Sequence, residues 1–343
     1  MEQKKLTVII PVYNSEKTIR KCVTSMEPER HQDVEYILVN DGSNDDSHKM
    51  CEVLAVQYHN VIVLNTTNCG VSHARNIGMK VATAEYIMFV DSDDYLETNS
   101  IFECLDVLNH HECDLLCFGC VSDYQTKDKI LNKQERREIR FPGVQTDVYA
   151  TFSVSDDFIW LFENNIFDSV WSKIYKRSII FDKEITFVEC MTIREDSEFV
   201  VHYTQFISSI GVLDRYFYHY CISGNELSYY LRREVHCEDI EKLMNRYNVF
   251  FMHYGIETVK VKELVYRHIF LLVMAGIVYN AAQMSHKSFR SLYLYIQSAG
   301  TMLADKYSFL TYRGFYALTA LLMKHRFNLL CAIICKARFY DAL

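Results

Sequence analysis

Two hydrophobic periodicities alternate along the first 120 residues. Residues 6–12 form a continuous apolar run that predicts a buried strand, and Ile19, Cys22 and Val23 then repeat at helical spacing. The strand pattern returns in residues 34–39, 61–64, 85–90 and 114–118. Strands that alternate with helices predict βαβ units. We therefore expect an α/β fold, with a Rossmann-like, mostly parallel sheet flanked by helices.

The pattern changes twice after this region. Residues 121–150 are polar and irregular, a mixed pattern follows, and the chain is helical after about residue 225. A length of 343 residues predicts one large domain or two. We expect a domain over residues 1–225 and an α-helical C-terminal region over residues 226–343.

Charge and cysteine content exclude two kinds of site. The formal net charge is −8 and no basic stripe occurs, so we expect no nucleic-acid binding. Among the 12 cysteines, Cys117 and Cys120 have no second pair that would complete a zinc site. Residues 1–5 lead straight into the first strand without a signal-peptide core, which favours reduced cysteines in a cytoplasmic protein.

The C-terminal region raises the question of membrane contact. No stretch reaches the ~18 apolar residues of a membrane span, and the nearest, residues 269–282, predicts a buried helix. Residues 315–339 combine apolar residues with four basic ones, Lys324, Arg326, Lys336 and Arg338. A helix of this kind could lie at the inner face of a membrane. The alternative is a helical subdomain that closes the acceptor side or mediates self-association as a homo-oligomer.

Polar, turn-forming residues follow four of the predicted strands. They are Tyr13-Asn14, Asp41-Gly42-Ser43, Asn68-Cys69-Gly70 and Asp91-Ser92-Asp93-Asp94. In open parallel sheets, ligands bind at the carboxyl ends of the strands. We therefore expect these four segments to form one composite site.

The last of these segments carries two carboxylates, Asp91 and Asp93, on a turn that leaves a buried strand. Mg²⁺ and Mn²⁺ prefer oxygen ligands and often bridge a carboxylate to substrate phosphates. The turn therefore predicts a divalent-metal site that would neutralise a departing diphosphate. The alternative is an ordinary turn capped by Asp and Ser before the next helix.

The segments after the second and third strands suit a nucleotide. Asn68 and Gly70 open a helix that carries Arg75 one turn in, which suits a phosphate or a polar nucleotide edge. An ordinary helix cap is the alternative. Asp41 could accept a hydrogen bond from a base N–H, although Asp-Gly is also common in turns.

Two segments of the second half could carry the remaining chemistry. Glu195 and Asp196 precede an apolar helical pattern, so Asp196 could remove a proton from a hydroxyl, or the pair could cap the helix start. Trp171 and Lys173 could line a pocket for that hydroxyl, or Trp171 could belong to the core. No dinucleotide fingerprint, P-loop, nucleophile elbow or HExxH motif occurs.

Four strings together resemble the inverting family-two glycosyltransferases, which have the GT-A fold. They are VIIPVYN from Val8, ILVNDGS from Ile37, NCGVSHARNIG from Asn68 and YIMFVDSDDYL from Tyr86. Their order and spacing match over residues 6–97, and a looser match continues to about residue 230. The resemblance implies a GT-A catalytic domain over residues 1–225, with a nucleotide-sugar-binding half (residues 1–97) and an acceptor-side half (residues 98–225).

The resemblance also implies a role for each site residue. The residues along the donor would be Pro11, Tyr13, Asn14, Glu16, Asp41, Asn68, Gly70, Arg75, Asp91 and Ser92, with Asp41 on the base. Asp93, together with Asp91, would bind Mn²⁺ or Mg²⁺. Asp196 would be the catalytic base. The residues facing the acceptor would be Trp171, Lys173 and Glu195.

The implied reaction is sugar transfer with inversion. The base would activate an acceptor hydroxyl, whose oxygen attacks the anomeric carbon opposite the nucleotide. The expected donor is a UDP-sugar and the expected acceptor is a glycan or a lipid-linked glycan of surface polysaccharide assembly. No QxxRW element of processive synthases occurs, which favours single additions. The alternative is a non-catalytic nucleotide-sugar-binding or scaffold protein of the same fold.

Overall fold

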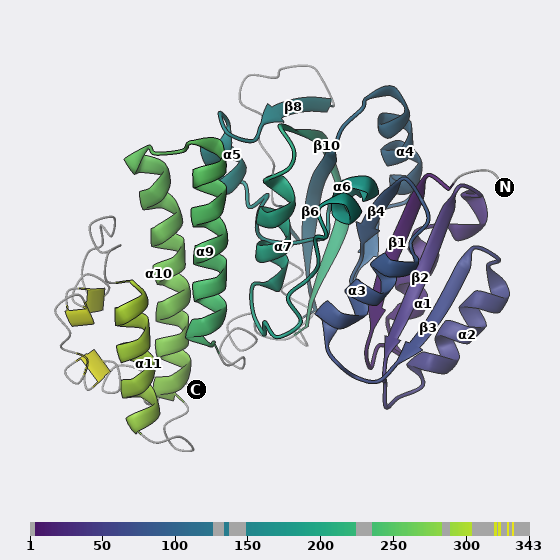
Figure 1. Cartoon of the computed structure of the whole chain (residues 1–343). Helices are drawn as coiled ribbons and strands as arrows, with labels where there is room; N and C mark the ends of the chain where they lie inside the picture. The colour runs from purple at the N-terminus through teal and green to yellow at the C-terminus, as the bar shows by residue number, and fades with distance from the viewer. Residues whose placement is uncertain are drawn as a thin grey trace. The chain divides into compact units, whose positions relative to one another are not determined.

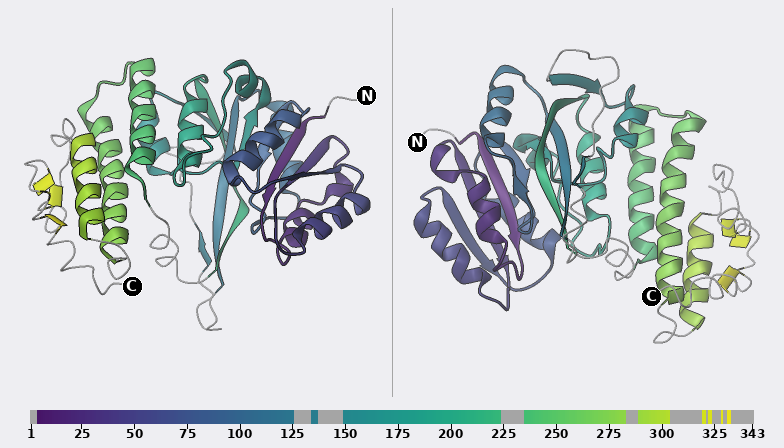
Figure 2. Two further views of the ribbon diagram at one scale, coloured as in Figure 1. Left: turned by 60° about the horizontal axis from the view of Figure 1, so that its bottom comes forward. Right: turned by 180° about the vertical axis from the view of Figure 1, so that it is seen from behind.

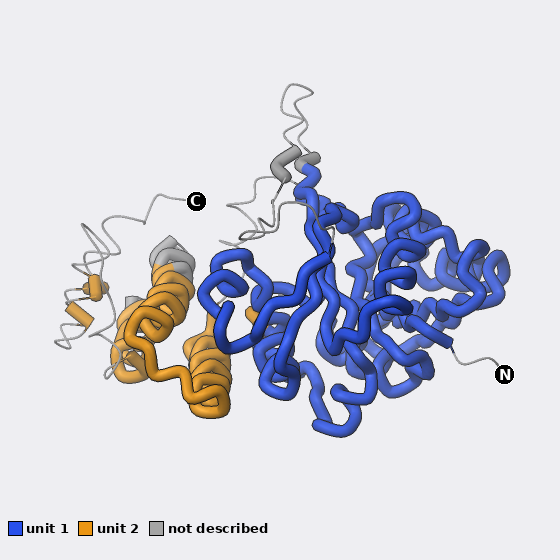
Figure 3. The backbone as a smooth tube through the Cα atoms, turned by 90° about the horizontal axis from the view of Figure 1, so that it is seen from above, with its two compact units in different colours: residues 1–190, 195–224 blue, residues 191–194, 225–343 orange. Residues whose placement is uncertain are grey.

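The computed structural model describes residues 4–125, 134–136, 149–223, 235–282 and 289–303, and the single residues 319, 320, 322, 323, 328, 331 and 332. The chain divides into two compact units (Figure 3). The first comprises residues 1–190 and 195–224, and the second comprises residues 191–194 and 225–343. Most of the polar segment 121–150 lies outside the described residues.

The first unit is built on one twisted, ten-stranded sheet (Figure 1). Its strands are β1 (Leu6–Val12), β2 (Val34–Asp41), β3 (Val61–Thr66), β4 (Tyr86–Phe89), β5 (Tyr95–Leu96), β6 (Leu115–Gln125), β7 (Gln134–Arg136), β8 (Tyr149–Ser153), β9 (Lys173–Lys176) and β10 (Ser209–Ser223). The strand order is β3-β2-β1-β4-β9-β6-β10-β5, and β7 and β8 pair with β6 and β10.

The predicted strands of the first 120 residues are present, and the α/β class is confirmed. β1 pairs in parallel with β2 and β4, and β2 pairs in parallel with β3. The carboxyl ends of these four strands therefore meet at one edge of the sheet. Beyond β4 the sheet is mixed, because β9 runs antiparallel between β4 and β6.

Helices cover both faces of the sheet. They are α1 (Ile19–Ser25), α2 (Ser47–Gln57), α3 (Val71–Val81), α4 (Ser100–His110), α5 (Phe158–Glu163), α6 (Arg177–Asp182) and α7 (Glu195–Thr204), with a 3₁₀ turn at Pro28–Arg30. On strands β1, β2 and β3, α1 and α2 lie on one face of the sheet and α3 on the other (Figures 1 and 2).

The alternation of side chains along β1 explains this arrangement. Val8 and Ile10 point into the core cluster that contains Cys22 of α1, whereas Ile9 points toward α3. A Cβ at Gly78 of α3 would lie only 2.4 Å from Ile9 Cγ2. Glycine at this position therefore lets α3 pack closely on the strand.

His31, after the 3₁₀ turn, makes the stability of this unit sensitive to acid. Its side chain is buried, and Nε2 has no hydrogen-bond partner among the described residues. Burial lowers the pKa of His31, against the opposing effect of Asp33. The unfolded chain takes up a proton near pH 6.5 that the folded chain resists, so this contribution to stability is present above that pH and is lost below it.

We therefore expect His31→Gln to flatten the acid limb of the stability profile. Urea unfolding at pH 7.5 and 5.5 should show a smaller loss of unfolding free energy in His31→Gln than in wild type. Equal losses in the two proteins would contradict this assignment.

The second unit is helical in its described part. Its helices are α9 (Cys237–Tyr254), α10 (Val259–Ala282) and α11 (Phe289–Met302). Residues 269–282 lie in α10, where Ile269, Phe270 and Val273 are buried as predicted. Segment 191–194 joins this unit through Thr192, whose N–H and hydroxyl both donate to Asp239 at 2.9 Å.

Membrane contact by this unit stays a prediction. None of the described helices combines the length and the apolar character needed to cross a membrane. The basic residues on which the prediction rests, Lys324, Arg326, Lys336 and Arg338, lie outside the described residues.

Candidate active site

The turn after β4 presents its acidic residues in two directions. Asp91 is partly exposed and Asp93 is exposed, whereas Asp94 is buried. The turn is closed by the Asp94 N–H, which donates to the Asp91 carbonyl at 3.1 Å. Asp91 and Asp93 are therefore the acids of this turn that a ligand can reach.

Asp94 is held inside the protein. Its Oδ2 accepts a hydrogen bond from the Tyr218 hydroxyl and its Oδ1 accepts one from the Cys221 N–H, both at 2.7 Å. Burial, followed by the charges of Asp91 and Asp93, raises the pKa of Asp94 to about 8. Asp94 thus fastens the turn to β10.

Asp93 suits a cation. Although exposed to solvent, it lies among enough protein atoms that desolvation, followed by the charge of Asp91, raises its pKa. A divalent cation between the two carboxylates would relieve this repulsion. The described residues contain no cluster of three His, Cys, Asp or Glu side chains that could hold a metal. Metal binding by Asp91 and Asp93 stays a prediction.

Arg75 of α3 joins the turn to α7. Its side chain is 3% exposed, and it donates to Asp91 Oδ1 at 2.8 Å and to Asp196 Oδ1 at 2.5 Å. Burial alone would lower the pKa of Arg75, but Asp196 and Asp91 raise it above its ordinary value. This buried cation thus joins Asp91 and Asp196, two predicted site residues that are far apart in the sequence.

Asp196 lies at the start of α7 with its carboxylate 18% exposed. Its Oδ2 accepts the Val170 N–H at 3.4 Å, next to the Trp171 segment. Glu195 is partly buried one residue earlier. Asp196 is thus fixed on both oxygens at the edge where the β4 turn and the 170–173 segment meet.

Asp41 has a local partner that sequence did not predict. It is buried, and its two carboxylate oxygens accept the backbone N–H groups of Cys69 and Gly70 at 2.9 and 2.8 Å. Gly42 adopts φ +65°, and a Cβ there would lie 2.6 Å from Asn68 N. Asp41 thus holds the ends of β2 and β3 together. Its predicted contact with a base stays a prediction.

The segment after β1 is cross-linked to its neighbours. Asn14 adopts φ 52°, and its Oδ1 accepts the Asn44 N–H at 2.9 Å. Glu16 accepts the Asp46 N–H at 3.2 Å. The hydroxyls of Ser15 and Ser92 lie 2.7 Å apart, which links this segment to the acidic turn.

Three predicted donor residues remain open to a ligand at this edge. Tyr13 is 46% exposed and Asn68 is exposed. Gly70 adopts φ +95°, and a Cβ added there would meet no atom within 4 Å. Pro11 is buried within β1 just before them. The polar ends of β1, β2, β3 and β4 therefore lie together at one edge of the sheet, and their role as one ligand site stays a prediction.

The predicted acceptor residues have different environments. Trp171 is half-buried and stacks on Tyr218 and Tyr220, with ring centroids 4.7 and 5.5 Å apart. Lys173 is buried; its Nζ donates to the carbonyls of Ser169 and Trp171 at 2.7 and 3.3 Å, and burial lowers its pKa. Lys173 therefore stabilises the backbone of the 169–171 segment through these two hydrogen bonds. Its contact with an acceptor stays a prediction.

Comparison with known proteins decides the family. The model of "Glycosyl transferase family 2" matches residues 7–180. The chain belongs to glycosyl transferase family 2. It is a glycosyltransferase, as the resemblance predicted.

Several named relatives of this family-2 glycosyltransferase come from bacteria. The uncharacterized glycosyltransferase EpsJ of Bacillus subtilis is 27% identical over 73% of this chain and 71% of its own length. Glycosyltransferase GlyA of Streptococcus pneumoniae is 30% identical over 50% of this chain, and the poly(ribitol-phosphate) beta-glucosyltransferase of Bacillus spizizenii is 29% identical over 64% of it. The chain spans only 24% and 32% of these two longer relatives.

Solved structures agree on the fold. S. aureus TarS 1–349 in complex with UDP aligns with a TM-score of 0.65 and 19% identity over 98% of this chain and 90% of that one. The mannosyltransferase PcManGT from Pyrobaculum calidifontis, in complex with GDP-Man and Mn²⁺, aligns with a TM-score of 0.50 and 13% identity over 98% of this chain and 88% of that one. The GT-A class of this family-2 glycosyltransferase is confirmed.

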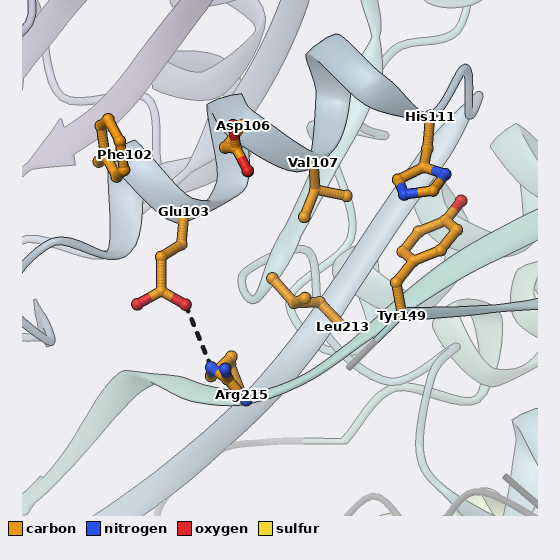
Figure 4. A pocket seen from close by; sticks show the side chains of 8 residues that line it. All are labelled: Phe102, Glu103, Asp106, Val107, His111, Tyr149, Leu213 and Arg215. Atoms are coloured by element: carbon orange, nitrogen blue, oxygen red, sulfur yellow. Dashed lines mark hydrogen bonds and ion pairs between the residues drawn. The ribbon is translucent and has the colours of Figure 1, made fainter. Parts of the chain in front are cut away.

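A cavity of about 490 Å³ lies elsewhere in this glycosyltransferase, along α4 and β10 (Figure 4). It is lined by Phe102, Glu103, Asp106, Val107, His111, Tyr149, Leu213 and Arg215. An ion pair between Glu103 and Arg215, at 3.1 Å, crosses one end, and His111 stacks on Tyr149 at the other. None of the predicted site residues lines it, so it is separate from the candidate active site.

Proposed function

We propose that this glycosyltransferase moves a sugar from a UDP-sugar to a hydroxyl of a glycan or lipid-linked acceptor, with inversion at the anomeric carbon. The observation that carries the proposal is the Arg75 bridge, which brings Asp91 of the acidic turn and Asp196 of α7 to one guanidinium. Asp91, whose carboxylate suits the donor, and Asp196, whose carboxylate suits proton removal, thus both contact the Arg75 guanidinium.

A UDP-sugar is supported as the donor by the structural relatives. TarS 1–349 has been solved with UDP and with UDP-GlcNAc, at TM-scores of 0.65 for both. The edge that would receive the nucleotide carries exposed Tyr13 and Asn68 beside the Gly70 turn. An aromatic side chain and backbone N–H groups at a helix start suit a base and its phosphates.

Asp93 and Asp91 would hold a divalent cation, either Mn²⁺ or Mg²⁺. When bound, such an ion supplies charge neutralisation for a diphosphate leaving group. The chain's own contribution is to place two carboxylates at the exposed side of the turn while Asp94 and Tyr218 hold its buried side. Arg75 fixes the orientation of Asp91 from the other direction.

Asp196 would act as the general base. It would accept the proton of the acceptor hydroxyl, and the hydroxyl oxygen would attack the anomeric carbon from the face opposite the nucleotide. The bond to the diphosphate then breaks as the new glycosidic bond forms, so configuration inverts. The N–H of Val170 and the Arg75 guanidinium hold the carboxylate in one orientation for this transfer.

Surface-polymer assembly is the proposed setting. The named relatives include the poly(ribitol-phosphate) beta-glucosyltransferase and a teichoic acid poly(glycerol phosphate) polymerase of Staphylococcus epidermidis, 38% identical over 31% of this chain. A lipid-linked acceptor would require approach to a membrane surface, for which the basic residues of 315–339 are the proposed contact. Trp171 and Glu195 are the proposed acceptor contacts near Asp196.

Calorimetric titration of UDP, GDP, TDP and CMP, each with Mn²⁺ and with EDTA, tests the donor assignment. We expect UDP to bind most tightly and its affinity to fall when Mn²⁺ is removed. Lys49→Ala, which removes an exposed residue of α2 whose side chain pairs with Asp46, is the control and should bind as wild type does. Failure of all four nucleotides to bind would contradict the proposal.

A further inference from the structure

A single hydroxyl of β10 fastens the acidic turn at two points. The Tyr218 hydroxyl accepts the backbone N–H of Asp91 at 3.1 Å and donates to Asp94 Oδ2 at 2.7 Å. These contacts join β10 to the first and the last residue of the Asp91–Asp94 turn, 127 and 124 positions away in sequence. The turn therefore takes its position from a strand of the second half of the fold.

The second oxygen of Asp94 is committed to the same strand. The Cys221 N–H donates to Asp94 Oδ1 at 2.7 Å, and the residue is 2% exposed. Each carboxylate oxygen of Asp94 thus accepts one hydrogen bond from β10. Asp94 therefore points away from the side of the turn on which a ligand can contact Asp91 and Asp93. Asp94 is therefore an anchor of the turn, although its sequence position next to Asp93 resembles that of a third ligand.

The ring that carries the hydroxyl cannot move freely. Tyr218 is fully buried, and Trp171 stacks on it with an interplanar angle of 11°. Next along β10, His219 stacks on Tyr95 at 4.2 Å, and Tyr218 pairs with Leu96 across the β5–β10 ladder. A rigid donor in a buried place can set the position of the turn to a fraction of an ångström.

We propose that Tyr218 is a positioning residue whose hydroxyl holds the Asp91–Asp94 turn in the conformation that lets Asp91 and Asp93 bind a divalent cation with the donor diphosphate. This inference rests on the proposed metal-dependent function. Removing the hydroxyl leaves the Asp91 N–H and Asp94 Oδ2 without their partner in a buried space, so the turn must shift to satisfy them. A shift of this kind separates two carboxylates that have to act together.

Tyr218→Phe tests the proposal, and Tyr36→Phe is its matched control. Tyr36 is also a fully buried strand tyrosine of the same core cluster, but its hydroxyl donates to the Met26 carbonyl, at 3.2 Å. Two readouts are needed: hydrogen exchange of the backbone amides in residues 91–97, and Mn²⁺ binding in the presence of UDP, followed by electron paramagnetic resonance of the free ion. Neither readout requires an active enzyme.

We expect Tyr218→Phe to accelerate exchange in residues 91–97 and to weaken Mn²⁺ binding by about tenfold to thirtyfold, because two buried hydrogen bonds of the turn are lost. Tyr36→Phe should leave both unchanged. Asp94→Asn, which keeps the size of the side chain, should weaken Mn²⁺ binding no more than Tyr218→Phe does, whereas Asp93→Asn should abolish it.

The outcomes separate the inference from the function on which it rests. If Tyr218→Phe behaves like Tyr36→Phe in either readout, Tyr218 does not position the turn. If Asp94→Asn abolishes Mn²⁺ binding as Asp93→Asn does, Asp94 is a ligand and the anchoring role is wrong. A wild-type protein that binds UDP but no Mn²⁺ would overturn the proposed metal-dependent function itself, and the inference with it.

Discussion

Asp196→Asn is expected to lower the rate of sugar transfer by about 10²–10⁴-fold, the range typical of a lost general base. The amide keeps the size of the side chain and can still accept hydrogen bonds through its oxygen, so the start of α7 should keep its structure. An amide cannot take the proton of an acceptor hydroxyl. The loss should therefore appear in kcat at saturating donor, with little change in the affinity for UDP.

Glu195→Gln is the matched control for this prediction. Glu195 is the adjacent acid on the same turn of α7 and is also partly buried. Its charge also raises the pKa of Arg75, but less than the charge of Asp196 does. Because Glu195 is a proposed acceptor contact, we expect Glu195→Gln to raise the KM for the acceptor, while kcat at saturating acceptor stays within about tenfold of wild type. If Glu195→Gln loses the larger factor and Asp196→Asn stays active, the base is Glu195.

Arg75→Met is expected to destabilise the first unit by about 3–5 kcal/mol, the usual cost of breaking a buried ion pair by removing one partner. Arg75 is the shared cation of Asp91 and Asp196, and it is 3% exposed. Without it, two carboxylates remain close together with no counter-charge in a site of limited solvent access. Urea unfolding followed by circular dichroism measures the loss, and sugar transfer should fall with it.

Arg215→Met provides the comparison. Arg215 pairs with Glu103 at 3.1 Å, but both side chains are more than 40% exposed, and exposed ion pairs contribute at most about 1 kcal/mol. A destabilisation by Arg75→Met no larger than that by Arg215→Met would contradict the bridging role. Arg75→Lys should give an intermediate result, because one ammonium cannot reproduce the two-pronged geometry of the guanidinium.

The sequence predicted the strands and the meeting of their polar ends well, because both follow from local patterns. Continuous apolar runs predict buried parallel strands, and the polar segments at their ends must share one edge once the strands are parallel. Asp91, Arg75 and Asp196 are candidates by residue type and position, and the strings that resemble a known family add a role for each. The contacts of Asp91 and Asp196 with the Arg75 guanidinium depend on how α3 and α7 pack on the sheet. No local sequence pattern predicts that packing.

The contacts that sequence missed are long-range or involve the backbone. Asp41 suited a base by its residue type, but its oxygens accept the N–H groups of Cys69 and Gly70 across two strand ends. Lys173 suited an acceptor pocket, but it is buried against carbonyls of its own segment. Tyr218 lies in the aromatic run of residues 216–220, which in sequence is typical of any buried strand.

Metal-dependent turnover of a nucleotide sugar tests the proposed activity most directly. UDP-, GDP-, TDP- and CMP-sugars would be incubated with wild type and with Asp93→Ala, each in Mn²⁺ and in EDTA, and the free nucleotide would be measured. We predict that wild type releases UDP from one UDP-sugar in Mn²⁺, and that both EDTA and Asp93→Ala abolish the release. Equal release from wild type in EDTA, or from Asp93→Ala in Mn²⁺, would contradict this activity, and so would the absence of release from every donor.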